Sequence, residues 1–156
     1  MTIQAFMTCM AVQFAYSPVA QLAAEKYQLP PLVYHALILA ESKYDPKAIN
    51  DKAAVASYGL AQLTIDTALE RCNLGFNEIM DPVKNIDCGA KVLSQHLRHH
   101  HGKLDLALSA YNAGTATPTN KAYVEGVYTE LRKLHQGDYG CSKQGALNPS
   151  TLRSNH

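Results

Sequence analysis

The sequence predicts a mainly α-helical fold in a single domain. Helix start and stop signals, such as Ser-Pro and Asp-Pro pairs and isolated glycines, recur along the 156 residues, with apolar residues at helical spacing between them. The alternating β-branched stretches that are typical of strands are scarce. A chain of this length can enclose one core, so we assign residues 1–156 to one domain of about six to eight helices.

The first expected helices come before any long connection. Residues 1–24 carry no charge, but they lack the basic start of a signal peptide, and glutamines interrupt their apolar run. We therefore expect an amphipathic or buried helix here, with no membrane span and no convincing signal peptide. Ser17 is the expected N-cap of a helix that Pro18 opens and that continues to about Tyr27.

A third helix is predicted from Pro30-Pro31 to about Glu41-Ser42, and it leads into a long connection. Residues 43–57 contain no helical pattern, and a loop of that length in a compact domain is usually functional. Ser57 precedes a short helix or turn over residues 59–63.

The next two elements have clear starts. Thr64 is the expected cap of a helix that continues to about Cys72, and residues 73–81 form another loop. The pair Asp81-Pro82 predicts the start of a long helix that Gly102 closes.

The last two helices complete the predicted order. A short helix runs from about Leu104 to Tyr111 and ends at Gly114. Thr119 is the expected cap of a final long helix that ends before Gly137. Residues 137–156 show no periodicity, so they are expected to form an irregular tail.

Composition excludes some partners and leaves others open. With 14 basic and 13 acidic residues, the formal net charge of +1 gives no reason to expect nucleic acid or a membrane surface as a partner. The seven histidines would make the surface more cationic below about pH 6.5.

The four cysteines leave two interpretations. Cys9, Cys72, Cys88 and Cys141 do not have zinc-site spacing, and they could form two bridges in any of three pairings. Pairing Cys72 with Cys88 would close a short loop, and pairing Cys9 with Cys141 would join the two ends. Four reduced cysteines acting as small core residues is the alternative for a protein made in a cytoplasm.

A histidine-rich segment follows in the predicted long helix. His96 and His100 share a helix face, but neighbouring histidines point in different directions, and no third ligand is evident. We interpret the segment as a solvated helix end that complements the helix dipole, and we expect no metal and no cofactor.

Glu41 is the candidate catalytic residue. It closes the apolar run Leu37 to Ala40, where poor solvation of a carboxylate would raise its pKa. A carboxylic acid kept neutral in this way can protonate a glycosidic oxygen. The alternative is a glutamate at a helix end whose carboxylate points into solvent.

Four sequence blocks around Glu41 carry a family resemblance. In order they are ESKYDPKA from Glu41, GLAQL from Gly59, AYNAG from Ala110 and YVxxV from Tyr123. Together they closely resemble the soluble lytic transglycosylases, which belong to the wider goose-type lysozyme fold. The resemblance covers about residues 20–136 and implies a lysozyme-like domain around a glycan-binding cleft.

The resemblance implies a reaction with one catalytic carboxyl group. Glu41 would first protonate the leaving oxygen and then, as a carboxylate, accept a proton from the attacking hydroxyl. In the family, the N-acetyl group and the C6 hydroxyl of N-acetylmuramic acid supply the nucleophiles. The implied cleavage is at the β-1,4 bond from N-acetylmuramic acid to N-acetylglucosamine, with a 1,6-anhydro product.

The resemblance also implies five substrate-binding residues. Gln62 would offer its amide to sugars, although a surface amide is the alternative. Tyr111 is expected near Glu41, with Asn112 holding a loop or the substrate, whereas packing and helix capping are the alternatives. Tyr123 would present its ring to a sugar or simply pack in the core. Ser57 is expected to supply a hydroxyl that the family usually has soon after its PxA segment.

Two other functions compete with the transglycosylase. A hydrolase of the same fold would hold water with a second acidic residue, such as Asp51 or Asp66. A glycan-binding scaffold domain in a phage particle or secretion apparatus would bind peptidoglycan strands without cleaving them. We expect a monomer that acts on the cell wall in the periplasm, delivered by a phage or released from the cytoplasm, with a secretion-system member as the alternative.

Overall fold

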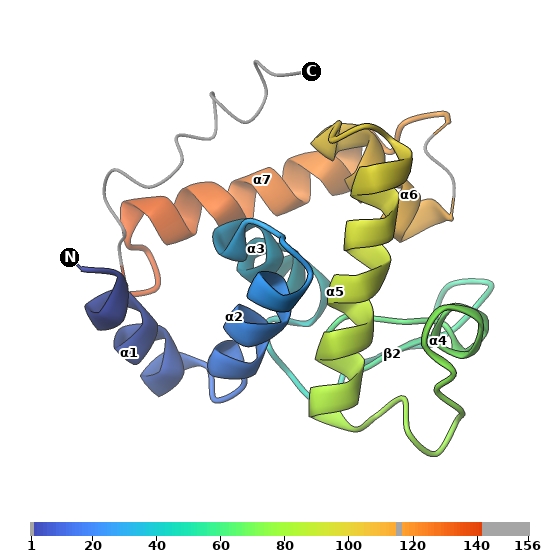
Figure 1. The fold of residues 1–156 in the computed structure, drawn as a ribbon, viewed down its shortest axis with the longest axis horizontal. Coiled ribbons are helices and arrows are strands. Elements are labelled where there is room, and N and C mark those ends of the chain that lie inside the picture. The colour runs from blue at the N-terminus through green and yellow to red at the C-terminus, as the bar shows by residue number, and fades with distance from the viewer. Residues whose placement is uncertain (1, 115–116, 142–156) are drawn as a thin grey trace.

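The computed structural model describes residues 2–114 and 117–141, and these residues form a mainly helical molecule (Figure 1). The predicted fold class, with about six to eight helices, is confirmed: the described part of the chain contains seven helices and one two-stranded antiparallel sheet. Residues 142–156 of the expected tail lie outside the described residues. The elements are α1 Ile3–Gln13, α2 Ser17–Lys26, α3 Pro31–Ser42, β1 Ile49–Asn50, β2 Ser57–Tyr58, α4 Ile65–Cys72, α5 Pro82–His99, α6 Leu104–Ala113 and α7 Lys121–Gln136.

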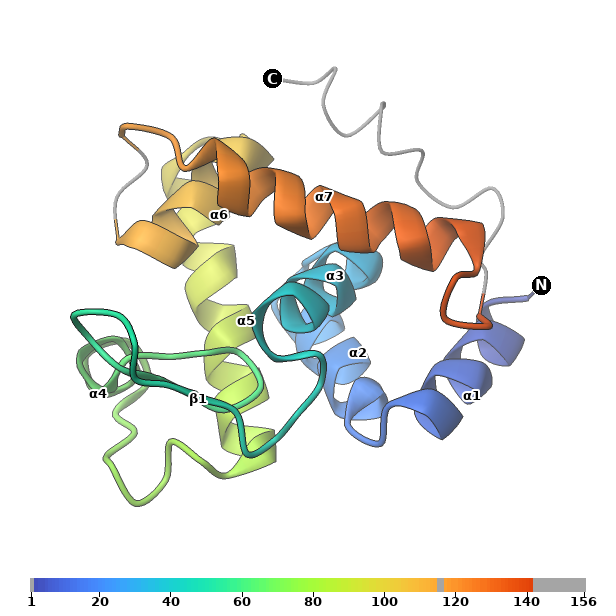
Figure 2. The ribbon, with the colours of Figure 1, turned by 180° about the vertical axis from the view of Figure 1, so that it is seen from behind.

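Helix α3 lies at the centre of the molecule. Every residue from Leu32 to Leu39 is buried, which is the pattern of a helix enclosed on all sides. Helices α2 and α7 pack against it, and α7 crosses it in both views (Figure 1, Figure 2). The end of this rigid helix is where the chain places Glu41.

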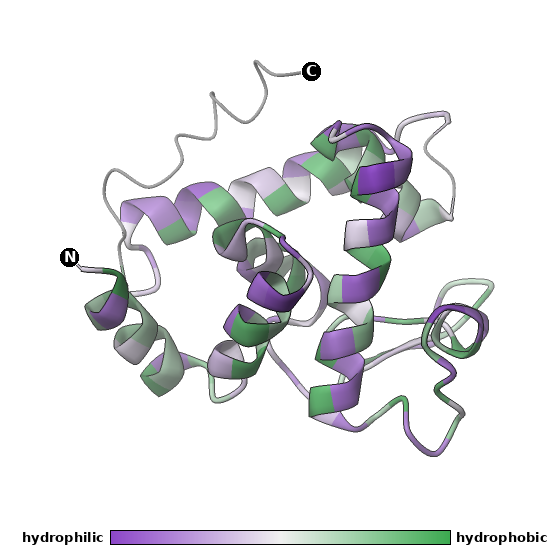
Figure 3. Ribbon diagram, viewed as in Figure 1, coloured by the Kyte–Doolittle hydropathy of each residue, from purple (hydrophilic) through white to green (hydrophobic). Residues whose placement is uncertain are grey.

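The surrounding helices are amphipathic. Apolar and hydrophilic residues alternate along α5 and α7 (Figure 3), and the buried stripe of α7 includes Val124, Val127, Leu131 and Leu134. Helix α1 buries Phe6 and Met10 in the same core. Within the described residues, no helix is both long and apolar enough to span a bilayer.

Two predicted helix caps are wrong by one residue. The cap of α7 is Asn120 and not Thr119, because the Asn120 side chain accepts a hydrogen bond from the Tyr123 amide at 3.2 Å. Ser17 is the first residue of α2 and its side chain is buried, so Tyr16 occupies the cap position. The predicted cap Thr64 and the predicted helix start at Asp81-Pro82 are confirmed, since the side chains of Thr64 and Asp81 each accept a hydrogen bond from a helix amide.

The connection after α3 contains a small hairpin that the sequence did not predict. Strands β1 and β2 pair Ile49 with Tyr58 and Asn50 with Ser57. Strands of two residues are too short to show an alternating pattern, which is why this segment was expected to be a connection only. Residues 59–62 then form a turn in which Gly59 has a φ of +76°.

All four cysteines are in disulfides. Cys9 pairs with Cys141, joining α1 to the segment that follows α7, and Cys72 pairs with Cys88, joining α4 to α5. Of the interpretations left open by the sequence, the structure has the two-bridge form and not the reduced one.

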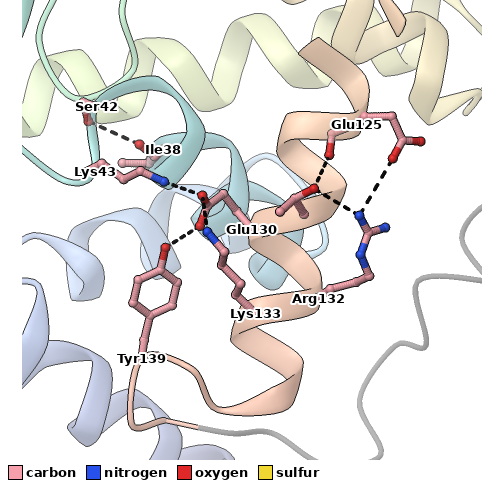
Figure 4. A network of polar contacts seen from close by, with 9 residues as sticks. Ile38, Ser42, Lys43, Glu125, Glu130, Arg132, Lys133 and Tyr139 are labelled. Atoms are coloured by element: carbon pink, nitrogen blue, oxygen red, sulfur yellow. Dashed lines mark hydrogen bonds and ion pairs between the residues drawn. The ribbon is translucent and has the colours of Figure 1, made fainter. Parts of the chain in front are cut away.

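A buried carboxylate joins the end of α3 to α7 (Figure 4). Glu130 accepts hydrogen bonds from Lys43, which follows α3, and from Tyr139, and it forms an ion pair with Lys133. Burial alone would raise the pKa of Glu130, but Lys43 and Tyr139 outweigh it and hold the pKa below its ordinary value. This network fixes the chain immediately beyond the last turn of α3.

Candidate active site

Glu41 lies in the last turn of α3 on the wall of a cavity of about 330 Å³. The wall also includes every residue predicted to bind substrate, although these residues come from four separate segments of the chain. They are Ser57, Gln62, Tyr111, Asn112 and Tyr123. The fold therefore brings the whole predicted set to one cavity.

The surroundings of Glu41 favour its protonated form. Burial raises the pKa of this carboxyl group to about 7, and the hydrogen bond from Tyr123 opposes the rise. The Tyr123 hydroxyl donates to Glu41 Oε1 at 2.5 Å, so it fixes one carboxyl oxygen while the side chain stays only half-buried. The alternative of a Glu41 carboxylate turned into bulk solvent is wrong.

Tyr123 has a role that its position in the sequence did not reveal. It lies in the first turn of α7, where ring stacking on a sugar and core packing were the two expectations. Its ring does pack against the core, and its hydroxyl reaches Glu41. Burial first, and then the nearby Glu41 charge, raise the pKa of Tyr123 well above its ordinary value, so the hydroxyl acts as a donor.

Tyr111 lies on the same wall and is hydrogen-bonded to the turn at residues 59–62. Its hydroxyl donates to the Ala61 carbonyl at 2.8 Å. The close packing depends on Gly89 of α5, because a Cβ at that position would lie 2.5 Å from the Ala61 Cβ and 3.1 Å from the Tyr111 hydroxyl. Tyr111 is thus near Glu41, and its hydroxyl is already engaged.

Gln62 uses its amide within the protein. Its Nε2 donates to the carbonyls of Ala48 and Gly59 at 3.1 and 2.9 Å, and its Oε1 accepts from Ser57 Oγ at 2.9 Å. Both amide hydrogens are therefore committed, which leaves one acceptor site on Oε1 for a ligand. Gln62 and Ser57 together hold the hairpin against the turn at residues 59–62.

Asn112 holds the segment that leads into α7. Its Oδ1 accepts from Asn120 Nδ2 at 2.7 Å, while the backbone amide of Asn120 donates to Ser109 Oγ at 2.7 Å. Asn112 is exposed and forms part of the cavity wall.

Asn85 organises the site from behind and was not predicted as a site residue. It is fully buried in the first turns of α5. Its Oδ1 accepts from the Ala61 amide at 2.7 Å, and its Nδ2 donates to the carbonyls of Tyr58 and Ile79. The available signal was an uncharged amide on the apolar face of a predicted helix, next to Ile86.

The acidic candidates for a second catalytic group lie elsewhere. Among the described residues, Glu41 is the only acidic side chain on the cavity wall. Asp51 and Asp66 are exposed and are not part of that wall, whereas the neutral Asn50 and Thr67 beside them are. The arrangement offers one proton-transfer group surrounded by hydroxyl and amide groups.

The histidines of α5 lie at a separate cavity. The rings of His96 and His100 have centroids 6.5 Å apart, as expected for two residues on one helix face. In the parts of the chain that the structure describes, no three His, Cys, Asp or Glu side chains are grouped so that they could hold a metal ion.

Comparison with known proteins places this architecture in a family. The model of the transglycosylase SLT domain matches residues 18–130, which is more than half of the chain. The chain belongs to the transglycosylase SLT domain family. The matched residues include Glu41 and all five other residues gathered at the cavity.

Individual relatives of this SLT domain come from a phage and from bacteria. The transglycosylase of Enterobacteria phage PRD1 is 33% identical over 93 residues, which cover 60% of this chain and 32% of the phage protein. Protein IpgF of Shigella flexneri is 27% identical over 119 residues, covering 72% of this chain and 78% of IpgF. The chain thus spans about a third of the phage relative.

A solved structure shares the fold of the SLT domain. An inactive mutant of the lytic transglycosylase Slt from Pseudomonas aeruginosa superposes with a TM-score of 0.69 over 89% of this chain. The match covers 27% of the Slt chain at 21% identity. At that identity the likeness establishes that the two chains share the same arrangement of helices.

Proposed function

We propose that this chain is a lytic transglycosylase of peptidoglycan with Glu41 as its catalytic acid and then base. It would cleave the β-1,4 bond from N-acetylmuramic acid to N-acetylglucosamine and form 1,6-anhydro-N-acetylmuramic acid. The observation that carries the proposal is the Glu41 carboxyl group, half-buried on a cavity wall with a pKa of about 7.

The first half of the reaction needs a proton at the leaving oxygen. A carboxyl group with a pKa of about 7 is about half protonated at neutral pH and mostly protonated below it, so Glu41 can donate to the glycosidic oxygen as the bond to C1 breaks. Tyr123 holds Glu41 Oε1, which leaves Oε2 for the substrate. The departing sugar takes the proton, and Glu41 becomes a carboxylate.

The second half of the reaction gives Glu41 a new proton. The N-acetyl group of the same muramic acid would stabilise C1, and its C6 hydroxyl would attack C1 while losing its proton to Glu41. No water is consumed, and the attack gains from proximity because the reacting groups belong to one sugar. A wall on which Glu41 is the one acidic group, among the described residues, supports this substrate-assisted route.

The remaining wall residues are proposed to position the sugar chain. Asn112 and Tyr111 would contact acetamide and ring groups, and the free acceptor site of Gln62 Oε1 would take a sugar hydroxyl. Ser57 acts mainly by holding Gln62. Tyr123 contributes through its bond to Glu41.

The setting of this reaction is proposed to be the periplasmic cell wall. The similarity to the transglycosylase of phage PRD1 supports delivery by a phage, as the sequence suggested. The similarity to IpgF of Shigella flexneri supports a bacterial setting as the second candidate.

A Glu41→Gln variant tests the mechanism. Loss of the proton donor should lower the rate of wall clearing by about 10² to 10⁴-fold, the usual contribution of a general acid. Glu70→Gln, an exposed change on α4, is the matched control and should clear walls as the parent does. Equal clearing by the Glu41 variant and the parent would contradict the assignment.

Mass spectrometry of the released fragments separates the rival reactions. Anhydro fragments, each lighter by one water than its reducing-end counterpart, support the transglycosylase. Reducing-end fragments would indicate the hydrolase, and binding to walls without release of fragments would indicate the scaffold domain.

A further inference from the structure

A second cavity adjoins the candidate active site and has a basic wall. It has a volume of about 440 Å³, and its lining includes Arg71 of α4, His96 and His99 of α5, and His100, the C-cap of α5. No acidic residue from the described parts of the chain lines it. Nothing in the proposed reaction uses these side chains.

The same three helices, α4, α5 and α6, line both cavities. Thr67 lines the catalytic cavity and Arg71, one turn further along α4, lines the basic one. Likewise, Val92 of α5 lines the first and His96, one turn later, lines the second. Helix α6 contributes to both walls. A polymer lying in the catalytic cavity therefore has the basic cavity beside it.

The basic groups are held in place. Arg71 Nη1 donates to Gln95 Oε1 at 3.3 Å, so the guanidinium is tethered to α5 next to the histidines. The adjacent disulfide, Cys72 to Cys88, fixes the end of α4 against α5. These two links hold Arg71 beside the histidines at the end of α5.

The charges within this cluster repel each other. Burial lowers the pKa of His96, and Arg71, His100 and His99 lower it further. Burial also lowers the pKa of His100, followed by the neighbouring His99 and His101. Helix α6 brings only uncharged groups to the cavity within the described residues. An anion placed here would relieve the repulsion and favour protonation of the histidines.

We propose that this basic cavity binds carboxylate groups of the peptides that branch from the glycan strand. Those peptides leave the muramic acid that the catalytic cavity would hold, so they emerge beside the reacting sugar. Arg71 supplies a permanent charge and a planar fork for a carboxylate, and the histidines add charge as the pH falls. The proposal rests on the proposed function, because it assumes that glycan strands occupy the neighbouring cavity.

Equilibrium binding to two forms of the strand tests this proposal. The full chain carrying Glu41→Gln is mixed with uncross-linked strands that keep their peptides, or with the same strands after an amidase has removed them. Peptides should tighten binding about tenfold, the effect of one charge-assisted contact. Adding Arg71→Gln should bring the ratio of the two dissociation constants close to one.

The matched control is Arg98→Gln, which removes the same charge from the exposed face of α5 outside the cavity. It should keep the tenfold ratio of dissociation constants. For the Glu41→Gln protein without a further change, this ratio should be larger at about pH 5.5 than at about pH 8, because the histidines are more protonated at the lower pH. Taking a ratio removes any contribution common to both strands.

Several outcomes would overturn the proposal, and they are distinct from failure of the proposed function. The peptide site alone is rejected if the Glu41→Gln protein binds both strands equally. It is also rejected if Arg98→Gln lowers the ratio of the two dissociation constants as much as Arg71→Gln does. If Arg71→Gln lowers the affinity for the peptide-free strand only, the cavity binds the lactyl carboxylate that the amidase exposes and not the peptides. Failure of both strands to bind rejects the glycan groove itself.

Discussion

At the scale of single residues, Glu41 combines two opposing influences. The apolar end of α3 disfavours its charge, while the Tyr123 hydroxyl favours it, and the balance leaves the pKa at about 7. A fully solvated carboxyl group would be ionised at neutral pH, and a fully enclosed one could not reach a substrate. Half-burial on a cavity wall satisfies both needs.

The first prediction concerns stability and pH. The folded pKa of Glu41 is raised from 4.5 to about 7, so the folded state holds this proton more tightly than the unfolded chain does. The stabilisation from that proton is complete below about pH 4.5 and is lost as the pH rises through about 7. Glu41→Gln should therefore be more stable than the parent by about 3 kcal/mol at high pH.

Urea unfolding at about pH 4 and about pH 8.5 measures this difference. The two proteins should have similar free energies of unfolding at the lower pH and diverge at the higher one. A difference that is independent of pH would show that Glu41 ionises without penalty in the folded state.

The second prediction concerns Tyr123. Its hydroxyl donates to the Glu41 carboxyl group and so lowers the Glu41 pKa. In Tyr123→Phe, the pH above which activity declines should move upward, because the charged form of Glu41 loses a stabilising donor. A pH-rate profile of wall clearing measures the shift.

Tyr128→Phe is the matched control, because Tyr128 lies on the same helix and its hydroxyl binds Asp105 instead. It should leave the alkaline limb of the profile where it is in the parent. If the alkaline limb is unchanged in Tyr123→Phe, a group other than Glu41 sets the pH above which activity declines.

At the scale of elements, the site is assembled where α5 passes behind the turn at residues 59–62. Gly89 allows that turn to approach closely, and Asn85 satisfies the turn's Ala61 amide and the Tyr58 carbonyl. Ser42 ties the same turn to α3, since its hydroxyl donates to the Leu60 carbonyl at 2.8 Å. The catalytic helix and the opposite wall therefore share one anchoring segment.

The third prediction compares two glycines inside helices. In Gly89→Ala, the new Cβ would meet the Ala61 Cβ at 2.5 Å and the Tyr34 hydroxyl at 2.7 Å, so α5 must shift away from the turn. We expect a loss of about 1 to 3 kcal/mol of stability, together with weaker glycan binding.

Gly126→Ala supplies the matched comparison with the opposite sign. A Cβ at that exposed position of α7 meets no atom within 4 Å, so alanine should stabilise the protein by about 0.5 to 1 kcal/mol. Thermal unfolding of both variants measures the contrast. The explanation fails if the two substitutions shift stability in the same direction.

At the level of the whole molecule, a disulfide and the Glu130 network both connect parts of the chain that are far apart in sequence. The Cys9–Cys141 disulfide spans 132 residues and joins α1 to the segment beyond α7, whereas Cys72–Cys88 spans only 16. The Glu130 network reinforces the first link, because Tyr139 lies two residues before Cys141 (Figure 4). The ends of the described chain are thus fastened to the core that contains α3.

The fourth prediction ranks the two disulfides. In the chain-entropy account, closing the longer loop restricts the unfolded chain more, by about 2 kcal/mol for these two separations. Replacing both Cys9 and Cys141 with serine should therefore lower the free energy of unfolding by more than replacing Cys72 and Cys88. Urea unfolding of the two double variants gives the ranking, and the reverse order would show that native packing dominates.

Local patterns along the chain were enough to predict the helical fold, the order of the elements and the identity of the candidate acid. Helix signals act within a few residues, which is why the cap at Thr64 and the helix start at Asp81-Pro82 could be predicted. The apolar run before Glu41 likewise lies next to it in the chain, and its effect on the Glu41 pKa could be expected from local sequence.

The contacts that each polar group of the site makes depend on how the helices pack. Tyr123 meets Glu41 across 82 positions of the chain, and Asn85 reaches Ala61 across 24, so no local pattern could pair them. Gln62 was expected to face sugars, yet its nitrogen is committed to Ala48 and Gly59. Hydrogen bonds and disulfides depend on which atoms the packed helices bring within reach, and that distance is set by the fold as a whole.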